Sequence, residues 1–322
     1  MADFSANLNE NLTVDLIDAA EEARANGGKE YTGYGVSVSR VGGHCTRSLY
    51  YDLIWASARE HIKAKTARIF RRGHWEESSM IERMKLAGME VLEVDPDTGK
   101  QFAVSRAKGI IRGKMDGKVL GVPEAPKTWH ALEIKSVSQK DFVALNKHGL
   151  QKAKREHWYQ LHEGMAAHSL SRGLYIAVNK LTDELFAERI RYDAKEATWT
   201  EERVLGVVNV TGAPPREQDD PNKAPCAWCK HKDVCHFGVP VRRSCRTCTS
   251  FTFTANGMGT CSRWNKHLGP KHQIEACPSH CTIPDLHVGT PVEVDEERHS
   301  IMYQMPNGAM IWDGERSDEV VA

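Results

Sequence analysis

Two nearby stretches decide the fold: residues 109–117 read GIIRGKMDG and residues 132–136 read LEIKS. Side chains alternate along a strand, so Glu133 and Lys135 share one face, while Leu132 and Ile134 point into apolar packing on the other. Glu133 follows Asp116 by 17 residues (133 − 116). If Asp116 ends the neighbouring strand, two carboxylates and an ammonium converge. Such a spot suits an oxygen-ligated divalent ion and a positioned water.

Around these stretches the sequence predicts a mixed α/β domain. Apolar spacing and turn residues predict helices at 13–25, directly after Cys45, at 74–87 and at 154–170. Strands are expected at 34–39, 91–94, 102–104, 109–119, 129–137, 174–178 and 185–190, with a hairpin joining 91–94 to 102–104 across the turn at 95–99. On the helix at 74–87, His74 and Glu77 share an apolar stripe with Ile81 and Met84. A carboxylate on such a stripe needs a functional reason.

Composition narrows the class of protein. With 322 residues, 40% of them hydrophobic and 27% charged, the chain is a globular protein and not a disordered or coiled-coil one. No apolar run reaches the span of a bilayer, which predicts no membrane partner. The 43 basic and 43 acidic residues leave DNA binding open, because metal-binding carboxylates offset cations that contact phosphate. Residues 1–10 lack the pattern of a secretory signal, which predicts a reducing cytoplasm.

The stretches at 109–117 and 132–136 resemble the core of the PD-(D/E)xK nuclease superfamily: Asp116, then Glu133-x-Lys135. Residues 72–77 (RGHWEE) resemble the glycine-containing helix start before the active site in the RecB-like branch and in phage lambda-type exonucleases. Residues 157–165 (HWYQLHEGM) resemble the glutamine motif that follows, with Gln160 as the glutamine. The family often has tyrosine four residues after this glutamine, where this chain has Gly164.

Cysteines supply a third match. The chain has nine, an odd number, several at two-residue spacing, which favours metal ligation over disulfides. One precedes the nuclease motifs and a C-x2-C-x5-C group follows them, an order similar to that of the iron-sulfur nucleases, including the CRISPR adaptation nuclease and the AddB subunit. The resemblance implies a 4Fe-4S cluster held by Cys45, Cys226, Cys229 and Cys235. A zinc site or buried free thiols are the alternatives.

For the active site, the resemblance implies a restriction-endonuclease-like mixed sheet flanked by helices, closed by the iron-sulfur staple. Magnesium or manganese would be ligated by Asp116, Glu133, the carbonyl of Ile134, and Glu77 or His74. Lys135 would orient the attacking water, and Gln160 would complete the catalytic residues. Basic clusters flank these helices and are candidates for phosphate binding: Lys63, Lys65, Arg68, Arg71, Arg72, Lys147, Lys152, Lys154 and Arg155.

A second cysteine group predicts a structural zinc module. Its thiols would form a closed tetrahedral site, with His280 or Cys281 as possible substitutes for the last one: Cys245, Cys248, Cys261 and Cys277. Basic residues around these ligands leave DNA contact open: Arg242, Arg243, Arg246, Arg263, Lys266 and Lys271. We expect a nuclease domain at 1–236, a zinc-ribbon-like module at 237–290, and a C-terminal hairpin and tail at 291–322, with the hairpin turning at 306–308.

Together these features predict a divalent-metal-dependent DNA exonuclease that acts at DNA ends in recombination, repair or phage DNA processing. Its expected partners are DNA, single-stranded or with accessible ends, and recombination or replication proteins. A phage-encoded chain would act in the host cytoplasm. The alternatives are a catalytically idle DNA-end-binding or scaffold protein with the stapled fold, and a CRISPR-adaptation-type nuclease. The sequence leaves strand polarity and oligomeric state open.

Overall fold

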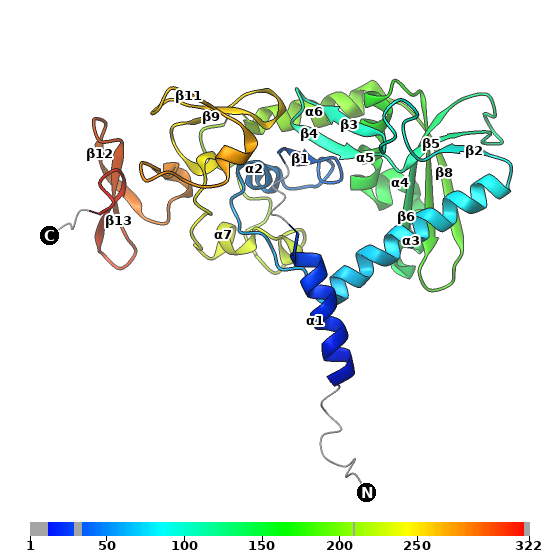
Figure 1. Ribbon diagram of the computed structural model, residues 1–322, viewed down its shortest axis with the longest axis horizontal. Helices are drawn as coiled ribbons and strands as arrows, with labels where there is room; N and C mark the ends of the chain where they lie inside the picture. The colour runs from blue at the N-terminus through cyan, green and yellow to red at the C-terminus, as the bar shows by residue number, and fades with distance from the viewer. Residues whose placement is uncertain (1–11, 29–33, 209, 319–322) are drawn as a thin grey trace, which may run out of the picture.

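The computed structural model describes residues 12–28, 34–208 and 210–318. The expectation for residues 1–10 lies outside these ranges. Within them, no helix combines the length and the apolar character needed to cross a membrane. The architecture is a mixed α/β fold, as the sequence predicts (Figure 1).

A five-stranded sheet forms the centre of the α/β part of the fold, in the order β2-β5-β6-β7-β8. Its strands are β2 (Glu90–Leu92), β5 (Gly117–Leu120), β6 (His130–Val137), β7 (Arg172–Asn179) and β8 (Leu185–Arg191). Only the β6–β7 pair is parallel among these neighbours, and in its register Glu133 lies opposite Tyr175. Both strands are buried on two faces, which explains their nearly continuous apolar runs.

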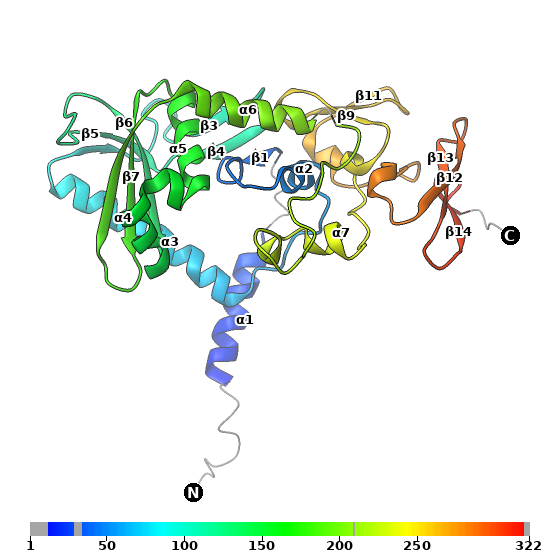
Figure 2. The same cartoon turned by 180° about the vertical axis from the view of Figure 1, so that it is seen from behind.

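Helices cover both faces of this sheet. Helix α3 (Ala64–Leu86) runs diagonally across one face, where Ile81 and Met84 pack against Leu132 and Ile134 of β6 (Figure 1). Helices α4 (Gln139–Ala153) and α5 (Arg155–Ala167) cover the other, as the reverse view shows (Figure 2). The alternation predicted for β6 is therefore confirmed: its apolar side chains face α3, and Glu133 and Lys135 face away from that core.

A smaller sheet, in the order β1-β4-β3, lies beside the first. It consists of β1 (Val36–Ser37), β4 (Ile111–Lys114) and β3 (Ala103–Arg106), and it packs with α2 (Thr46–Ile54) and α6 (Ala194–Val208) around a large apolar core. Cys45 is the N-cap of α2, and its thiol accepts the Ser48 N–H at 3.4 Å. Helix α1 (Leu12–Asn26) buries no side chain and is tied to α3 by Arg68, which pairs with Asp18 and Glu21.

The cysteine-rich remainder contains little regular structure. Its helices are α7 (Lys232–His236) and the 3-10 turns η1 (Cys226–Trp228), η2 (Cys245–Thr247), η3 (Ala255–Gly257), η4 (Pro270–Gln273) and η5 (Pro284–Leu286). Two antiparallel sheets follow: β9 (Phe251–Phe253), β10 (Gly259–Cys261) and β11 (Lys266–Leu268), then β12 (Thr290–Asp295), β13 (Ser300–Gln304) and β14 (Met310–Gly314). The predicted hairpin across 306–308 is confirmed as β13–β14, with β12 as an additional strand.

One buried arginine joins this cysteine-rich part to the α/β part of the fold. Arg246 is 1% exposed and lies over the ring of Trp55, with its guanidinium carbon 3.8 Å from the ring centre. It donates to the carbonyls of Leu53 at 2.7 Å and Tyr34 at 3.2 Å. The same guanidinium donates to Gln273 at 2.7 Å. DNA contact, which the sequence leaves open for Arg246, is therefore excluded for this residue, because its guanidinium is buried and donates to protein groups.

Three predictions of local structure are wrong. The hairpin from 91–94 to 102–104 does not form. The turn itself is present, because the Gly99 N–H donates to the Asp95 carbonyl at 2.8 Å. The flanking strands do not pair with each other, since β2 pairs with β5 and β3 pairs with β4. The strand at 109–119 is two strands in different sheets, β4 and β5. The helix at 74–87 begins ten residues earlier (74 − 64), at Ala64, so Gly73 lies inside α3 and does not start it.

Candidate functional site

The carboxylates and the lysine predicted from the sequence lie together on β6, the central strand of the five-stranded sheet, and on the connection from β4 to β5 beside it. Asp116 lies directly before β5, and its Oδ2 accepts the Ile134 N–H at 2.7 Å. Lys135 Nζ contacts Glu133 Oε1 directly, lies 3.6 Å from Asp116 Oδ2, and donates to the Ile134 carbonyl at 3.1 Å. One ammonium therefore bridges two carboxylates that arrive from neighbouring strands.

Helix α3 adds a third carboxylate. Burial and then the negative charge of Asp116 raise the pKa of Glu77, while the Lys135 charge lowers it. His74 lies at the surface, with a side chain 81% exposed, and its Nδ1 is 3.9 Å from Glu77 Oε2. Of the two candidates that the sequence offers on this helix, Glu77 shares the field of Asp116 and Lys135, and His74 reaches only Glu77.

The charge of this cluster is unbalanced. Burial, followed by the charges of Asp116 and Glu77, raises the pKa of Glu133 to about 8. Burial alone lowers the pKa of Lys135, but the surrounding carboxylates outweigh it and hold that pKa above its usual value. Two carboxylates thus share a single ammonium, with Glu77 adding negative charge nearby, and such like charges oppose full ionisation unless a further cation is supplied. The excess negative charge is what a divalent ion would neutralise.

Gln160 lies on α5, which packs on β6, and its amide oxygen is buried without a hydrogen-bond partner among the described residues. A buried amide oxygen without a partner costs free energy, so it is a candidate to receive a ligand. Four residues later, Gly164 lies against Met115, the residue before Asp116. A β-carbon at position 164 would come within 2.8 Å of the Met115 sulfur. The close packing leaves no room for the tyrosine that the resembled family often has there.

Two residues of this region carry no prediction from the sequence. Tyr175, opposite Glu133 in the ladder, has its hydroxyl 2.9 Å from His157 Nδ1. Burial, with the charges of Lys135 and Lys154, lowers the pKa of His157 to about 3. The only sequence signal is that His157 precedes Gln160 by three residues and so shares its face of α5. His157 is a neutral ring held close to the site lysine.

The first cysteine group also assembles. Cys45, Cys226, Cys229 and Cys235 line one cavity between α2 and α7, although 181 residues (226 − 45) separate the first two along the chain. Burial, and then the charges of the other three, raise the pKa of Cys226. Free space inside the cavity is only about 10 Å³.

The thiols of the second cysteine group also lie near one another. Burial, followed by the charges of Cys248, Cys277 and Cys261, raises the pKa of Cys245 to about 11. Cys281 is buried against Ile301 and Tyr303. His280 Nε2 lies 3.2 Å from the Thr247 hydroxyl. These contacts favour Cys277 over His280 and Cys281 as the fourth member of the group.

Metal binding has to be judged from the donors themselves. Across the described ranges, no three His, Cys, Asp or Glu side chains are already arranged to hold a metal ion. The donor sets nevertheless fit the chemistry: hard carboxylate oxygens around Lys135, and four thiols in each cysteine group. In the carboxylate site, Lys135 already places positive charge against both Glu133 and Asp116.

This arrangement defines a class of site: acidic side chains and a lysine on the central strand of a mixed sheet and on the connection beside it. No family model matches the chain, and no curated protein sequence matches it. Solved structures of partial similarity include LHK-Exo in complex with dAMP (TM-score 0.39, 18% identity, 54% of this chain and 86% of that one). The alkaline exonuclease LHK-Exo from Laribacter hongkongensis has a TM-score of 0.39 and 18% sequence identity, covering 60% of this chain and 90% of that one. SSO0001 has a TM-score of 0.40 and 14% sequence identity, covering 70% of this chain and 96% of that one. TM-scores of this size do not establish a common fold, so the assignment depends on the site itself.

Proposed function

We propose that this protein is a divalent-metal-dependent DNA exonuclease that hydrolyses phosphodiester bonds at DNA ends. The observation that carries the proposal is the contact of Lys135 with both Asp116 and Glu133, with Glu77 of α3 in the electrostatic field of the same groups. Packing alone gives no reason to place two carboxylates, one of them 2% exposed, against one ammonium. Perturbed titratable groups gathered in this way are typical of functional sites.

The residues take distinct roles in this proposal. Asp116, Glu133 and the Ile134 carbonyl, with Glu77, would hold magnesium or manganese. When bound, the ion polarises the phosphodiester and lowers the pKa of a water molecule. Lys135 keeps its proton, orients the attacking water and donates hydrogen bonds to the charge that develops on the phosphate. The water gives up a proton to solvent and its oxygen forms a bond to phosphorus as the bond from phosphorus to the leaving oxygen breaks, and the leaving oxygen takes up a proton from solvent.

The cysteine groups would act as staples. We propose a 4Fe-4S cluster at Cys45, Cys226, Cys229 and Cys235, and a structural zinc ion at Cys245, Cys248, Cys261 and Cys277. Joining Cys45 to Cys226 closes a loop whose entropy in the unfolded chain is on the order of 4 to 5 kcal/mol. The cluster would therefore stabilise the ends of the domain that carries the carboxylates, and the zinc ion would stabilise the module at 237–290.

Exonuclease action in recombination, repair or phage DNA processing is the preferred process. The rival is a catalytically idle protein that binds DNA ends, and a CRISPR-adaptation-type nuclease differs from the proposal in its partners. Lys135 in contact with both Asp116 and Glu133 supports the active enzyme, because an idle scaffold has no chemical need for all three. The two classes differ in one measurement, the release of nucleotides in the presence of magnesium.

The test is degradation of end-labelled linear DNA with magnesium, beside covalently closed circular DNA. We expect the linear DNA to be degraded and the circle to survive. Glu133→Gln, which keeps the shape and removes the charge, should abolish degradation, while Glu124→Gln, an exposed control, should not. Equal degradation by Glu133→Gln would reject this site. Binding of ends by the wild-type protein without any degradation would support the idle scaffold.

A further inference from the structure

A second polar site lies beside the first cysteine group. It is a cavity of about 440 Å³ between the start of α3, the end of α2 and the loop that carries Lys230. Cavities of this size bind small ligands or single units of polymers. Four of its lining residues are basic, namely Arg40, Arg59, Lys230 and Arg242, against the two carboxylates of Asp52 and Glu60. The lining therefore carries excess positive charge.

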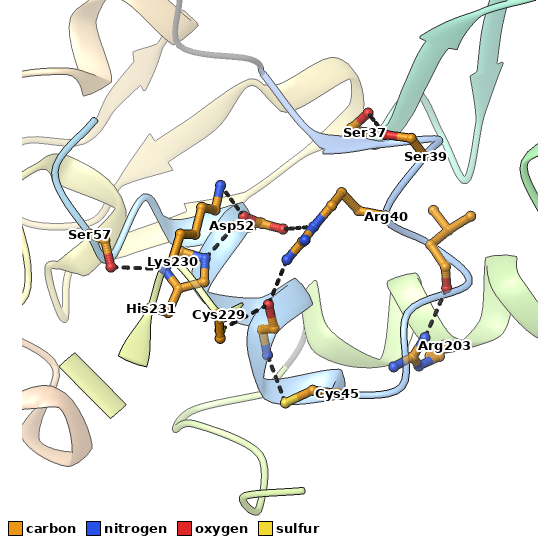
Figure 3. A network of polar contacts seen from close by, with 12 residues as sticks. Ser37, Ser39, Arg40, Cys45, Asp52, Ser57, Arg203, Cys229, Lys230 and His231 are labelled. Atoms are coloured by element: carbon orange, nitrogen blue, oxygen red, sulfur yellow. Dashed lines mark hydrogen bonds and ion pairs between the residues drawn. The ribbon is translucent and has the colours of Figure 1, made fainter. Parts of the chain in front are cut away.

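A buried carboxylate organises the cations. Asp52, whose side chain is 8% exposed, accepts Arg40 Nε on Oδ2 at 3.2 Å and lies 2.5 Å from Lys230 Nζ through Oδ1 (Figure 3). His231 Nε2 lies 3.0 Å from the same Oδ1, and its Nδ1 is 2.8 Å from the Ser57 hydroxyl (Figure 3). Arg40 and Lys230 nevertheless keep 46% and 44% of their side chains exposed. One fixed anion thus holds two cations in place while they still face solvent.

The cavity also has an aromatic wall. Phe70 of α3 lines it and is 56% exposed, whereas Trp55 is only 8% exposed because Arg246 lies over its ring. Phe70 is therefore the ring that is accessible to a ligand. Exposed aromatic faces beside cations are the pattern by which proteins bind single-stranded nucleic acid, with bases stacked and phosphates on the cations.

Helix α3 relates this cavity to the carboxylates. Phe70 and Glu77 are seven residues apart in one unbroken helix, so they lie on the same side of it, about 10 Å apart at about 1.5 Å per residue. A short single strand of DNA spans a distance of this size. A single strand that follows α3 can therefore reach both sites.

We propose that the cavity lined by Arg40, Arg59, Lys230 and Phe70 binds one nucleotide of single-stranded DNA, on the same strand as the phosphate at the carboxylates and a short distance along it. The base stacks on Phe70, and the phosphate contacts the basic side chains. The placement relative to the cleaved phosphate depends on the proposed nuclease function. The same chemistry would accept a free nucleoside monophosphate, so the experiment has to separate the strand from the released nucleotide.

The test is binding of a fluorescent single-stranded oligonucleotide, followed by anisotropy with EDTA present so that cleavage does not interfere. Phe70→Ala should weaken binding by about 5-fold or more, the range of lost base stacking. Arg59→Gln should weaken it and reduce the slope of log K against log salt by about one. Matched controls are Leu86→Ala, 82% exposed on the same helix, and Lys127→Gln, an exposed cation beyond β5; neither should change affinity.

Three outcomes decide the proposal. Loss of strand affinity in both cavity variants, with both controls unchanged, supports it. Strand affinity equal to wild type in Phe70→Ala and Arg59→Gln overturns it. Reduced affinity for dAMP with unchanged strand affinity also overturns it, because the cavity would then serve free nucleotide only. A wild-type protein that binds strands through Phe70 but degrades none with magnesium would reject the nuclease and leave the cavity assignment standing.

Discussion

Glu133 of β6 lies opposite Tyr175 of β7, and the Tyr175 hydroxyl is 2.9 Å from His157 Nδ1. The parallel pairing thus connects the carboxylate site, through Tyr175, to His157 of α5. Burial, followed by the charges of Lys135 and Lys154, lowers the pKa of His157 to about 3. The neutral ring adds no charge to a cluster that is already strongly coupled.

His157 predicts a pH dependence of stability. Between pH 6.5, the ordinary value, and about 3, the unfolded chain binds a proton at this ring and the folded protein does not. The free energy of unfolding should therefore fall as the pH is lowered through this window, and His157→Gln should flatten the fall. Urea unfolding of the two proteins between pH 4 and 7 measures it. His148→Gln, at the surface, is the control; an equal pH slope in wild type and His157→Gln would contradict the prediction.

Glu77 and His74 should differ sharply in their effect on activity. Glu77→Gln removes a carboxylate that shares the field of Asp116 and Lys135, so the magnesium concentration for half-maximal activity should rise on the order of 100-fold. His74→Ala should change it little, because this ring is largely exposed. Metal titration of DNA degradation measures both. A larger effect in His74→Ala would transfer the metal contact to the histidine.

Gly164 should be sensitive to a single added methyl group. Gly164→Ala places a β-carbon 2.8 Å from the Met115 sulfur, so Met115 must move, at a cost of about 1 kcal/mol or more, and Asp116 moves with it. We expect lower stability and lower activity. Gly206→Ala in α6 has open space around it and should stabilise by up to about 1 kcal/mol. Thermal unfolding of the pair checks the contrast, which fails if both variants behave alike.

Arg246 should contribute strongly to stability. Arg246→Met leaves the carbonyls of Leu53 and Tyr34 without their donor in a buried site, which should cost about 3 kcal/mol or more. Arg263→Met, which removes a partly exposed pair with Glu315, should cost less than about 1 kcal/mol. Chemical unfolding measures both values. Similar losses in the two variants would show that the buried arginine has no special role.

The two cysteine groups should bind different metals. Anaerobically purified protein should be brown and contain both iron and zinc. Cys229→Ser should lose iron and colour but retain zinc, and Cys248→Ser should lose zinc but retain colour, because the two substitutions fall in separate groups. Metal analysis of the purified variants decides. A colourless protein that contains only zinc would assign the first group to zinc.

The sequence predicts the strands of the central sheet well. The expected strand at 129–137 is β6, His130–Val137, because its alternation reflects a charged side and an apolar side that the fold preserves. The prediction of one strand at 109–119 is wrong because the chain breaks at Met115 and Asp116. Its first half pairs in one sheet and its second half in the other, and no local sequence pattern encodes this long-range pairing. The start of α3 fails because Gly73 suggests a boundary, whereas a long helix tolerates one glycine at about 1 kcal/mol.

The residues of the candidate site also fall into those that the sequence predicts and those that it does not. Asp116, Glu133 and Lys135 could be predicted because they lie on adjacent strands close in sequence. His157 and Tyr175 could not, since Tyr175 reaches Glu133 only through a parallel pairing across a 42-residue separation (175 − 133). Helix α4, which has a non-helical Gly149 near its end, has no counterpart in the prediction. The structure supplies what depends on long-range pairing.

The continuity of α3 limits how this protein can change in length. Each residue of a helix turns the chain by about 100°, so one inserted or deleted residue between Phe70 and Glu77 would rotate the carboxylate away from Lys135. The turn at 95–99 can absorb such a change without altering the register of either sheet. A library of single-residue insertions and deletions should therefore be tolerated around that turn and depleted within the seven-residue interval on α3.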